Sequence, residues 1–192
     1  MTEPSSYIGK WFAVRVKPKA ERVVSTLVQQ KGYEEFLPLY KDRRRWSDRY
    51  KWVELPLFAG YVFCKLHTET RMPILTIPGV LNFVGIGKVP APISEAEIAA
   101  IQTSINSGLV MEPWPYLSVG QRVAVEEGPL TGIEGILVEA RKQHRIVISI
   151  SLLQRSMAVE IDRAWVRPLD ATGRKLSPYI ASPSGSQPLC IG

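Results

Sequence analysis

The sequence predicts an α+β protein in which an N-terminal antiparallel sheet with packed helices is followed by a small β-barrel. Two observations predict this fold class. In the first part of the chain, segments with the two-residue period of a strand alternate with segments that have the period of a helix. In the second part, short β-branched segments are separated by turns. The length of 192 residues allows one domain or two, and a hydrophobic share of 45% is ordinary for a chain that buries a core.

The first part begins with a strand and a helix. Residues 10–17 place Phe12, Val14 and Val16 on one face, which is the period of a strand. In 19–31, apolar residues recur at three- and four-residue steps, which predicts a helix with one apolar stripe.

The next segments are a charged stretch and further strands. After an extended segment at 33–40, the stretch KDRRRWSDRYKW at 41–52 carries no apolar periodicity, so we expect a projecting hairpin or loop. Residues 55–66 predict a mostly buried strand, and a short helical piece is expected around 68–76. The segment 77–87 predicts another strand, bounded by Pro and Gly.

A second long helix is predicted at 94–105. Ser94 stands at its start and Glu97 follows three residues later, which is the pattern of a capping box. In such a box the two side chains satisfy backbone N–H groups at the start of the helix. Ile98 and Ile101 then lie on one face of the helix.

After this helix, Gly108, Pro113 and Pro115 are expected to break any regular element, so we interpret the segment as a linker. The content of Ser, Pro and Gly near the C-terminus predicts a disordered tail. The resulting domain prediction is a first domain at 8–107, a linker at 108–117, a barrel at 118–169 and a tail at 170–192.

The second domain is expected to contain short strands at 119–126, 133–140, 144–152 and 156–161. Because an open sheet of such strands would leave exposed edges, a small barrel is expected. Its glycines, Gly128, Gly132 and Gly135, are best explained by tight turns and close approaches of the backbone.

The composition argues against several classes of function. No stretch approaches the roughly 20 consecutive apolar residues of a membrane span, and no secretion signal is seen, so we expect a cytoplasmic protein without a membrane partner. Cys64, Cys190, His67 and His144 do not stand at metal-ligand spacing, so no metal and no cofactor are expected. Without a P-loop, GxGxxG or GxSxG motif, no enzyme is expected. The net charge of +6 favours polyanionic partners.

Several motifs resemble those of a known family. The segments WFAV at 11–14, FAGYVF at 58–63 and IPGV at 77–80, which leads to PAPIS at 90–94, resemble the NGN domain of the NusG family. The segments VGQRV at 119–123, EGPLTG at 127–132 and EGILV at 134–138 resemble a KOW motif, which implies that the barrel is SH3-like. A KOW motif alone is shared with ribosomal proteins, but the order NGN then KOW is much more specific.

The resemblance implies a transcription elongation factor that binds the clamp helices of the largest RNA polymerase subunit, suppresses pausing and modulates termination or antitermination. The polymerase-binding patch carries over as Tyr61, Phe63, Val80 and Phe83. Such a patch is physically reasonable, because a pair of amphipathic helices docks best in a shallow apolar groove with aromatic anchors. The alternative is that these residues are core residues of their own domain.

The resemblance further implies a position near the upstream DNA fork. Lys41, Arg43, Arg44, Arg45, Arg49 and Lys51 would then contact phosphates of upstream-fork or non-template DNA, and Trp46, Tyr50 and Trp52 would stack on exposed bases. The alternative is a solvated hairpin kept soluble by its charge.

Family members use a loop between late barrel strands to contact the Rho terminator or a ribosomal protein. In general NusG proteins this loop carries an aromatic residue followed by Gly-Arg, and the matching positions here are Leu153, Gln154 and Arg155. We assign the partner contact to Leu152, Leu153 and Arg155. The departure from the family pattern weakens the expectation of Rho binding and suggests a specialised paralogue that acts on particular operons.

One alternative function from another class stays open. An RNA-binding or ribosome-associated KOW protein could act without polymerase. Its binding would weaken steeply with salt, whereas docking through an apolar patch tolerates salt. In either case we expect a monomer.

Overall fold

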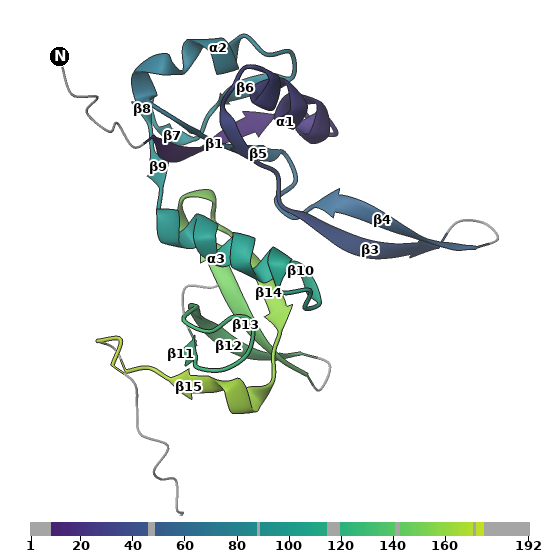
Figure 1. Cartoon of the computed structure of the whole chain (residues 1–192), viewed down its shortest axis with the longest axis vertical. Helices are drawn as coiled ribbons and strands as arrows, with labels where there is room; N and C mark the ends of the chain where they lie inside the picture. The colour runs from purple at the N-terminus through teal and green to yellow at the C-terminus, as the bar shows by residue number, and fades with distance from the viewer. Residues whose placement is uncertain are drawn as a thin grey trace, which may run out of the picture.

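The computed structural model describes residues 9–45, 49–87, 89–114, 120–140, 143–170 and 172–174. It consists of an N-terminal sheet with helices and a C-terminal barrel, and helix α3 lies between the two (Figure 1). The predicted α+β fold class is confirmed. Within the described residues, no helix is long and apolar enough to cross a membrane.

The N-terminal sheet is built around the first strand. β1 (Lys10–Val16) pairs antiparallel with β5 (Tyr61–Leu66) along one edge and with β6 (Val80–Phe83) and β9 (Pro92–Ile93) along the other. β2 (Glu34–Phe36) pairs with the outer edge of β5. The strand order is β2-β5-β1-β6.

The alternation of side chains divides this sheet into two faces. Phe12, Val14 and Val16 of β1 pack with Val24 and Val28 of α1 (Glu21–Gln30), as the two periodicities predicted. Helix α2 (Met72–Leu75) covers the same face after the 3₁₀ turn η1 (Thr68–Thr70).

The opposite face of the sheet packs on α3 (Glu95–Asn106). Trp11, Ala13 and Phe63 belong to the same apolar cluster as Ile98 and Ile101 of that helix. This cluster continues without a break into the core of the barrel. The two parts of the chain are therefore in apolar contact.

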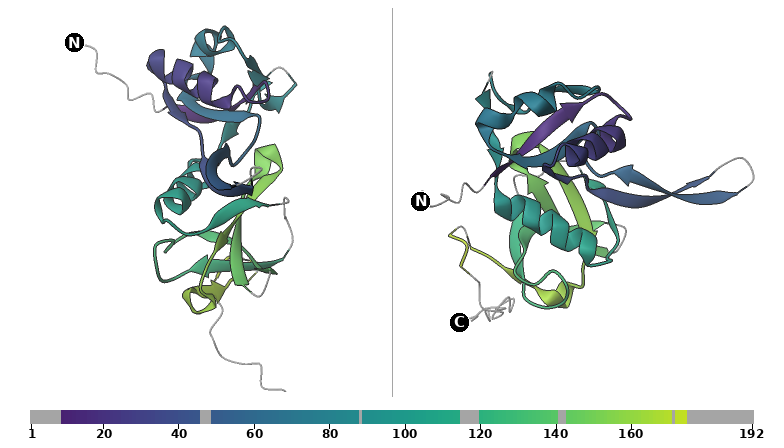
Figure 2. Two further views of the ribbon diagram at one scale, coloured as in Figure 1. Left: turned by 90° about the vertical axis from the view of Figure 1, so that its right-hand side faces the viewer. Right: turned by 45° about the horizontal axis from the view of Figure 1, so that its top comes forward.

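Two hairpins lie outside the main sheets. β3 (Leu39–Arg45) and β4 (Tyr50–Pro56) form a two-stranded ribbon that projects from the body of the protein in Figure 1 and in the right-hand view of Figure 2. β7 (Gly85–Ile86) and β8 (Val89–Pro90) form a shorter one. The projecting hairpin that the charge pattern predicted at 41–52 is confirmed as a pair of strands.

The capping box predicted for α3 is wrong. Ser94 is the N-cap residue, but among the described residues its side chain makes no capping hydrogen bond. Glu97 instead accepts a hydrogen bond from the backbone N–H of Ser151, at 3.2 Å. The barrel brings the backbone N–H of Ser151 within reach of the carboxylate, so Glu97 makes a long-range contact.

The C-terminal part is a six-stranded antiparallel sheet in the order β10-β14-β13-β12-β11-β15. Its strands are β10 (Met111–Trp114), β11 (Gln121–Val125), β12 (Glu134–Ala140), β13 (Gln143–Ile150), β14 (Arg155–Glu160) and β15 (Val166–Pro168). The 3₁₀ turn η2 (Ser151–Leu153) joins β13 to β14, and η3 (Arg163–Trp165) precedes β15. Ile146, Ile150 and Met157 are fully buried in its core.

Gly135 allows two of these strands to approach closely. A Cβ atom at this position would lie 2.6 Å from the carbonyl oxygen of Val147 and 2.6 Å from Cγ1 of Ile146. No larger residue fits this part of β12 without displacing backbone, so the glycine permits the packing of β12 on β13.

The expectation that no regular element forms at 108–117 is corrected by β10. Met111–Trp114 pairs with β14, and Pro113 is tolerated because β10 is the end strand in the sheet order. Arg145 of β13 is 5% exposed and forms an ion pair with Glu112, and its guanidinium lies 5.8 Å from the centre of the Trp114 ring. These contacts fix much of the segment to the barrel.

Candidate docking surfaces

Five aromatic residues gather on the face of the N-terminal sheet that packs on α3. Four of the rings form a row in which neighbours are in contact. The distances between ring centres are 6.4 Å for Trp11 and Phe36, 6.1 Å for Phe36 and Phe63, and 5.8 Å for Phe63 and Phe58. Tyr61 is half-buried and packs against the same cluster. We call these five residues the aromatic face.

The four residues predicted to bind polymerase do not form one patch. Tyr61 and Phe63 alternate with Val62 along β5 and lie on the aromatic face. Val80 and Phe83 lie on the opposite face, where Phe83 is 8% exposed and its ring stands edge-on to Phe12 at 6.2 Å. The β1–β6 register explains this, because Phe83 pairs with Val14 and cross-strand partners share a face.

The aromatic face is enclosed from the α3 side. The start of α3 is held to β5 by an ion pair between Lys65 and Glu95, 2.9 Å long, and the hydrogen bond in this pair raises the pKa of Lys65. The Lys65 ammonium also lies 5.7 Å from the centre of the Trp11 ring. Phe63 has no exposed surface, while Tyr61 and Phe36 are half-buried.

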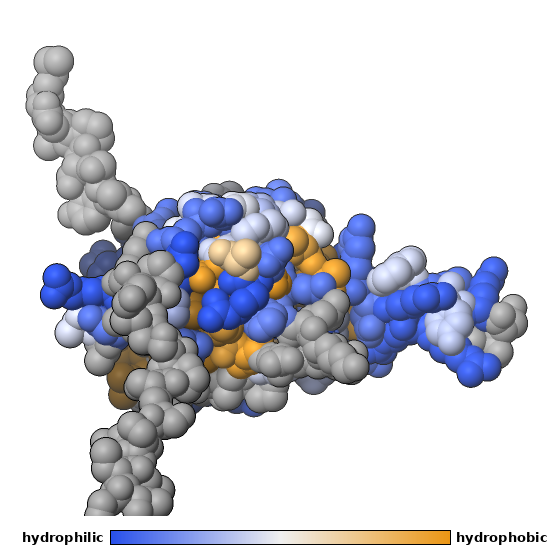
Figure 3. Space-filling view, turned by 90° about the horizontal axis from the view of Figure 1, so that it is seen from below, coloured by the Kyte–Doolittle hydropathy of each residue, from blue (hydrophilic) through white to orange (hydrophobic). Residues whose placement is uncertain are grey.

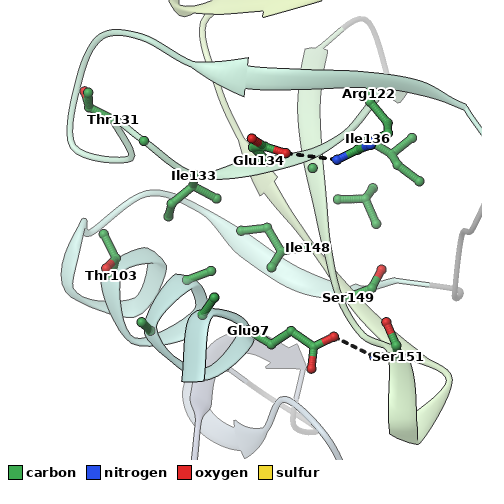
Figure 4. Close-up of a pocket in the computed structure, with 16 residues that line it drawn as sticks. Glu97, Thr103, Arg122, Thr131, Ile133, Glu134, Ile136, Ile148, Ser149 and Ser151 are labelled. Carbon is green, nitrogen blue, oxygen red and sulfur yellow. Dashed lines mark hydrogen bonds and ion pairs between the residues drawn. The ribbon is translucent and has the colours of Figure 1, made fainter. Parts of the chain in front are cut away.

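A groove of about 790 Å³ lies between α3 and the barrel (Figure 4). Small residues of α3, including Ala96, Ala99 and Ala100, form one wall, and Ile133, Ile136 and Ile148 contribute to the other. The hydrogen bond from Ser151 to Glu97 crosses this groove. The two parts of the chain thus meet through a partly open interface.

The barrel loop assigned to a protein partner forms η2 and the residues after it. Leu153 is 7% exposed and belongs to the shared apolar cluster, Leu152 is half-buried against it, and Arg155 is exposed. Gln154, at the position where the resemblance expects glycine, has a left-handed backbone with φ of 50°. Arg155 is the most accessible of the three assigned side chains.

The hairpin residues assigned to nucleic acid are exposed. Of the predicted set, the structure gives exposed side chains to Lys41, Arg43, Arg44, Arg45, Arg49, Tyr50, Lys51 and Trp52, and Trp46 lies outside the described residues. The guanidinium of Arg43 lies 4.3 Å from the centre of the Tyr50 ring. Trp52 is 69% exposed, the largest such value among the exposed aromatic side chains of the described chain.

The described titratable groups do not converge on one site. Burial raises the pKa of the Cys64 thiol to about 12, so this group stays protonated near neutral pH. In the part of the chain that the structure describes, no group of three or more His, Cys, Asp or Glu residues could hold a metal ion. Cys190 and most of the predicted tail at 170–192 lie outside the described residues.

The sequence interpretation missed three contributors to the aromatic face and one to the interface. Trp11, Phe36 and Phe58 belong to that face, and Glu97 contacts the barrel. Because Trp11 neighbours Phe12 in a strand, the sequence indicates that their side chains lie on opposite faces of the sheet. The sequence does not tell which of these faces binds a partner.

Comparisons with known proteins agree with this architecture. The family description "Transcription termination factor nusG" matches residues 9–102. The transcription termination/antitermination protein NusG of Helicobacter pylori is 32% identical over 122 residues, which are 62% of this chain and 69% of that protein. The NusG of Campylobacter jejuni is 29% identical over 164 residues, or 79% of this chain and 93% of that one.

A solved structure shares the fold. The structure titled "Domain interaction in Thermotoga maritima NusG" aligns with a TM-score of 0.51 at 22% identity, over 82% of this chain and 95% of that chain. The sequence relatives place the protein in the class of transcription termination and antitermination factors. The chain belongs to the NusG family.

Proposed function

We propose that this protein is a non-enzymatic, monomeric and cytoplasmic elongation factor that binds the clamp helices of the largest RNA polymerase subunit through its aromatic face. The observation that carries the proposal is the contact series of rings on one face of the sheet, in a chain of the NusG family. Large rings around a shallow apolar surface are good anchors for a pair of amphipathic helices.

In this proposal the barrel and the clamp helices compete for the same region. The apolar cluster that contains Phe63 and Tyr61 also contains barrel residues such as Leu152 and Leu153. A clamp helix pair that reaches the half-buried rings therefore has to displace the barrel, and α3 has to move from the sheet as well, because α3 encloses the same face. The groove between α3 and the barrel favours the first of these movements, because a partly open interface is easier to part than a close-packed one.

The barrel itself recruits a second factor through its η2 turn. Arg155 offers an exposed cation beside this turn, and Leu152 offers an apolar contact once the barrel has moved away from α3. Leu153 and Gln154 replace the aromatic and the glycine of general NusG proteins. We therefore propose a specialised, operon-specific antiterminator, with a ribosomal protein or Rho as the partner of its barrel and with Rho binding weakened by these replacements. The basic hairpin would meanwhile reach nucleic acid near the upstream fork.

The test is capture of the full-length protein by a purified clamp-helix fragment of the cognate polymerase, at low and at high salt. We expect capture that resists salt, and stronger capture for Glu97→Ala, which loosens the barrel. Tyr61→Ala should weaken capture. Tyr33→Ala is the matched control, because Tyr33 is half-buried against the apolar cluster on the other face of the sheet.

The opposite outcome is equally clear. If neither the native chain nor Glu97→Ala is captured at either salt concentration, the polymerase proposal fails. An RNA-binding or ribosome-associated protein then becomes the better explanation. If capture succeeds, assays of pausing and of Rho-dependent termination decide between an antiterminator and a general factor.

A further inference from the structure

The β3–β4 hairpin has two chemically different faces. Residues that pair across an antiparallel ribbon share a face, and the register pairs Lys41 with Glu54, Arg43 with Trp52, and Arg45 with Tyr50. All six side chains are exposed. We call this set the stacking face.

The other face of the hairpin is less basic and less aromatic. It carries Asp42, Arg44, Lys51 and Val53, which pair as Asp42 with Val53 and Arg44 with Lys51. Arg44 forms an ion pair with Asp42 at 3.2 Å, so the charge of one of the two cations on this face is already compensated within the strand. At the base of the hairpin this face continues to Tyr40, which packs against the shared apolar cluster.

We infer that the stacking face binds an unpaired nucleic-acid strand, with bases on Trp52 and Tyr50 and phosphates on the flanking cations. The inference rests on the nucleic-acid contact that the proposed function gives to the hairpin, and narrows it to one face. Stacking on exposed rings between cations holds single strands without strict sequence readout, because every base has a flat aromatic surface. The two rings are 57% and 69% exposed for Tyr50 and Trp52.

The surroundings of Trp52 fit a base and its backbone. A groove of about 600 Å³ lies beside the ring and is lined by Arg22, Lys41, Trp52, Val53 and Glu54. Arg22 comes from α1 and forms an ion pair with Glu54 at 3.1 Å, which compensates the only acidic residue of the stacking face. Lys41, Arg43 and Arg45 therefore remain as its cations for phosphate.

The charge distribution also favours a polyanion. In Figure 3 the described hairpin projects from the body as mostly hydrophilic surface, with paler residues among the blue ones. A ribbon that presents side chains to solvent on both faces does not need aromatic residues for its own packing. More than half of the surface of Trp52 and of Tyr50 stays exposed in this position, and a stacked base would cover more of it.

The experiment measures binding of the full-length protein to fluorescently labelled 20-nucleotide probes: oligo-dT, oligo-U and a DNA duplex. We expect both single strands to bind more tightly than the duplex at moderate salt, and the comparison of dT with U identifies which strand is preferred. Trp52→Leu should weaken binding to the preferred strand by about fivefold or more, since stacking of one base contributes about 1–3 kcal/mol. Trp52→Phe should retain most of it.

Matched variants on the other face make the test specific. Arg43→Ala and Arg44→Ala each remove one positive charge from β3. We expect substantial weakening for Arg43→Ala and less than about twofold for Arg44→Ala. Thermal unfolding of each variant confirms that it folds, which we expect because these side chains lie on an exposed ribbon.

Three results would overturn the inference: no binding of either single strand, tighter binding of the duplex, or equal losses for Arg43→Ala and Arg44→Ala together with no effect of Trp52→Leu. The last of these would show that net charge alone attracts the strand. Because the assay contains no polymerase, its failure leaves clamp-helix capture untouched, and failed capture leaves the stacking face untouched.

Discussion

The carboxylate of Glu97 accepts a hydrogen bond of 3.2 Å from the backbone N–H of Ser151, across 54 positions of sequence. Glu97 lies in the first turn of α3, and Ser151 begins the η2 turn of the barrel. One polar contact therefore joins the element that covers the aromatic face to the loop that we assign to a second partner.

Replacing Glu97 should loosen the barrel without unfolding either part. The contact is exposed, so we expect Glu97→Ala to lower the free energy of unfolding by less than about 1 kcal/mol. The Ser151 amide proton should exchange faster with solvent, which amide hydrogen exchange by NMR measures directly. Glu97→Gln keeps an acceptor oxygen and should protect the amide partly. An unchanged exchange rate in Glu97→Ala would show that this contact does not hold the barrel.

Tyr61 and Phe63 should respond differently to truncation although they are two residues apart. Phe63 has no exposed surface, so Phe63→Ala should destabilise the protein by about 3–5 kcal/mol. Tyr61 is half-buried, so Tyr61→Ala should cost about 1 kcal/mol. Thermal or urea unfolding measures both values. A loss for Tyr61→Ala as large as that for Phe63→Ala would mark Tyr61 as core and remove it from the docking surface.

The ion pair between Glu112 and Arg145 should stabilise the barrel. Arg145 is 5% exposed, so Glu112→Ala removes an ion-pair partner from a buried guanidinium. We expect Glu112→Ala to cost about 2–3 kcal/mol, less than for a fully buried pair because water reaches the Glu112 side. Urea unfolding tests this, and Glu112→Ala combined with Arg145→Met should recover part of the loss. No recovery in the double variant would mean that Glu112 acts through packing rather than charge.

Cys64 should be unreactive in the folded protein. Burial raises the pKa of its thiol to about 12 from 9.0, so the fold favours the neutral form. In a Cys190→Ser variant at pH 8, iodoacetamide should modify Cys64 only after unfolding in urea. Rapid labelling of the native protein would contradict this expectation.

The same pKa shift predicts a dependence of stability on pH. The unfolded thiol ionises above about pH 9 while the folded one does not, so ionisation favours the unfolded state. The contribution is fully present below pH 9 and declines as the pH rises toward 12. Urea unfolding at pH 8 and pH 10.5 should show a smaller loss for Cys64→Ala than for the protein with Cys64.

Local periodicity predicted most of the elements, because strands and helices with one buried face repeat their apolar residues at fixed steps. The strand at 10–17, the helix at 19–31 and the alternation of Ile146, Ile148 and Ile150 all appear in the structure. The parity of a strand, however, does not say which face of the sheet meets which partner. For this reason Phe83 was wrongly grouped with Tyr61 in the predicted polymerase-binding patch. Its face of the sheet becomes known only from its register with Val14.

Long-range contacts decided the other differences. Pro113 is a sound reason to expect a break, yet the end position of β10 tolerates it and pairing with β14 organises the segment. Glu97 stands at the sequence position of a capping residue, but its carboxylate accepts a hydrogen bond from the distant Ser151 instead. Identifying the stacking face likewise requires the β3–β4 register. The charged stretch has no apolar pattern that would indicate which of its residues share a face.

The continuous apolar cluster has a thermodynamic consequence for how this protein comes apart. Side chains from the sheet, from α3 and from the barrel share one core, so each part is stabilised by the folded state of the other. Two such units behave as one cooperative system as long as they touch, and as two independent ones after they separate. A partner that displaces the barrel thus also changes the number of transitions by which the chain melts.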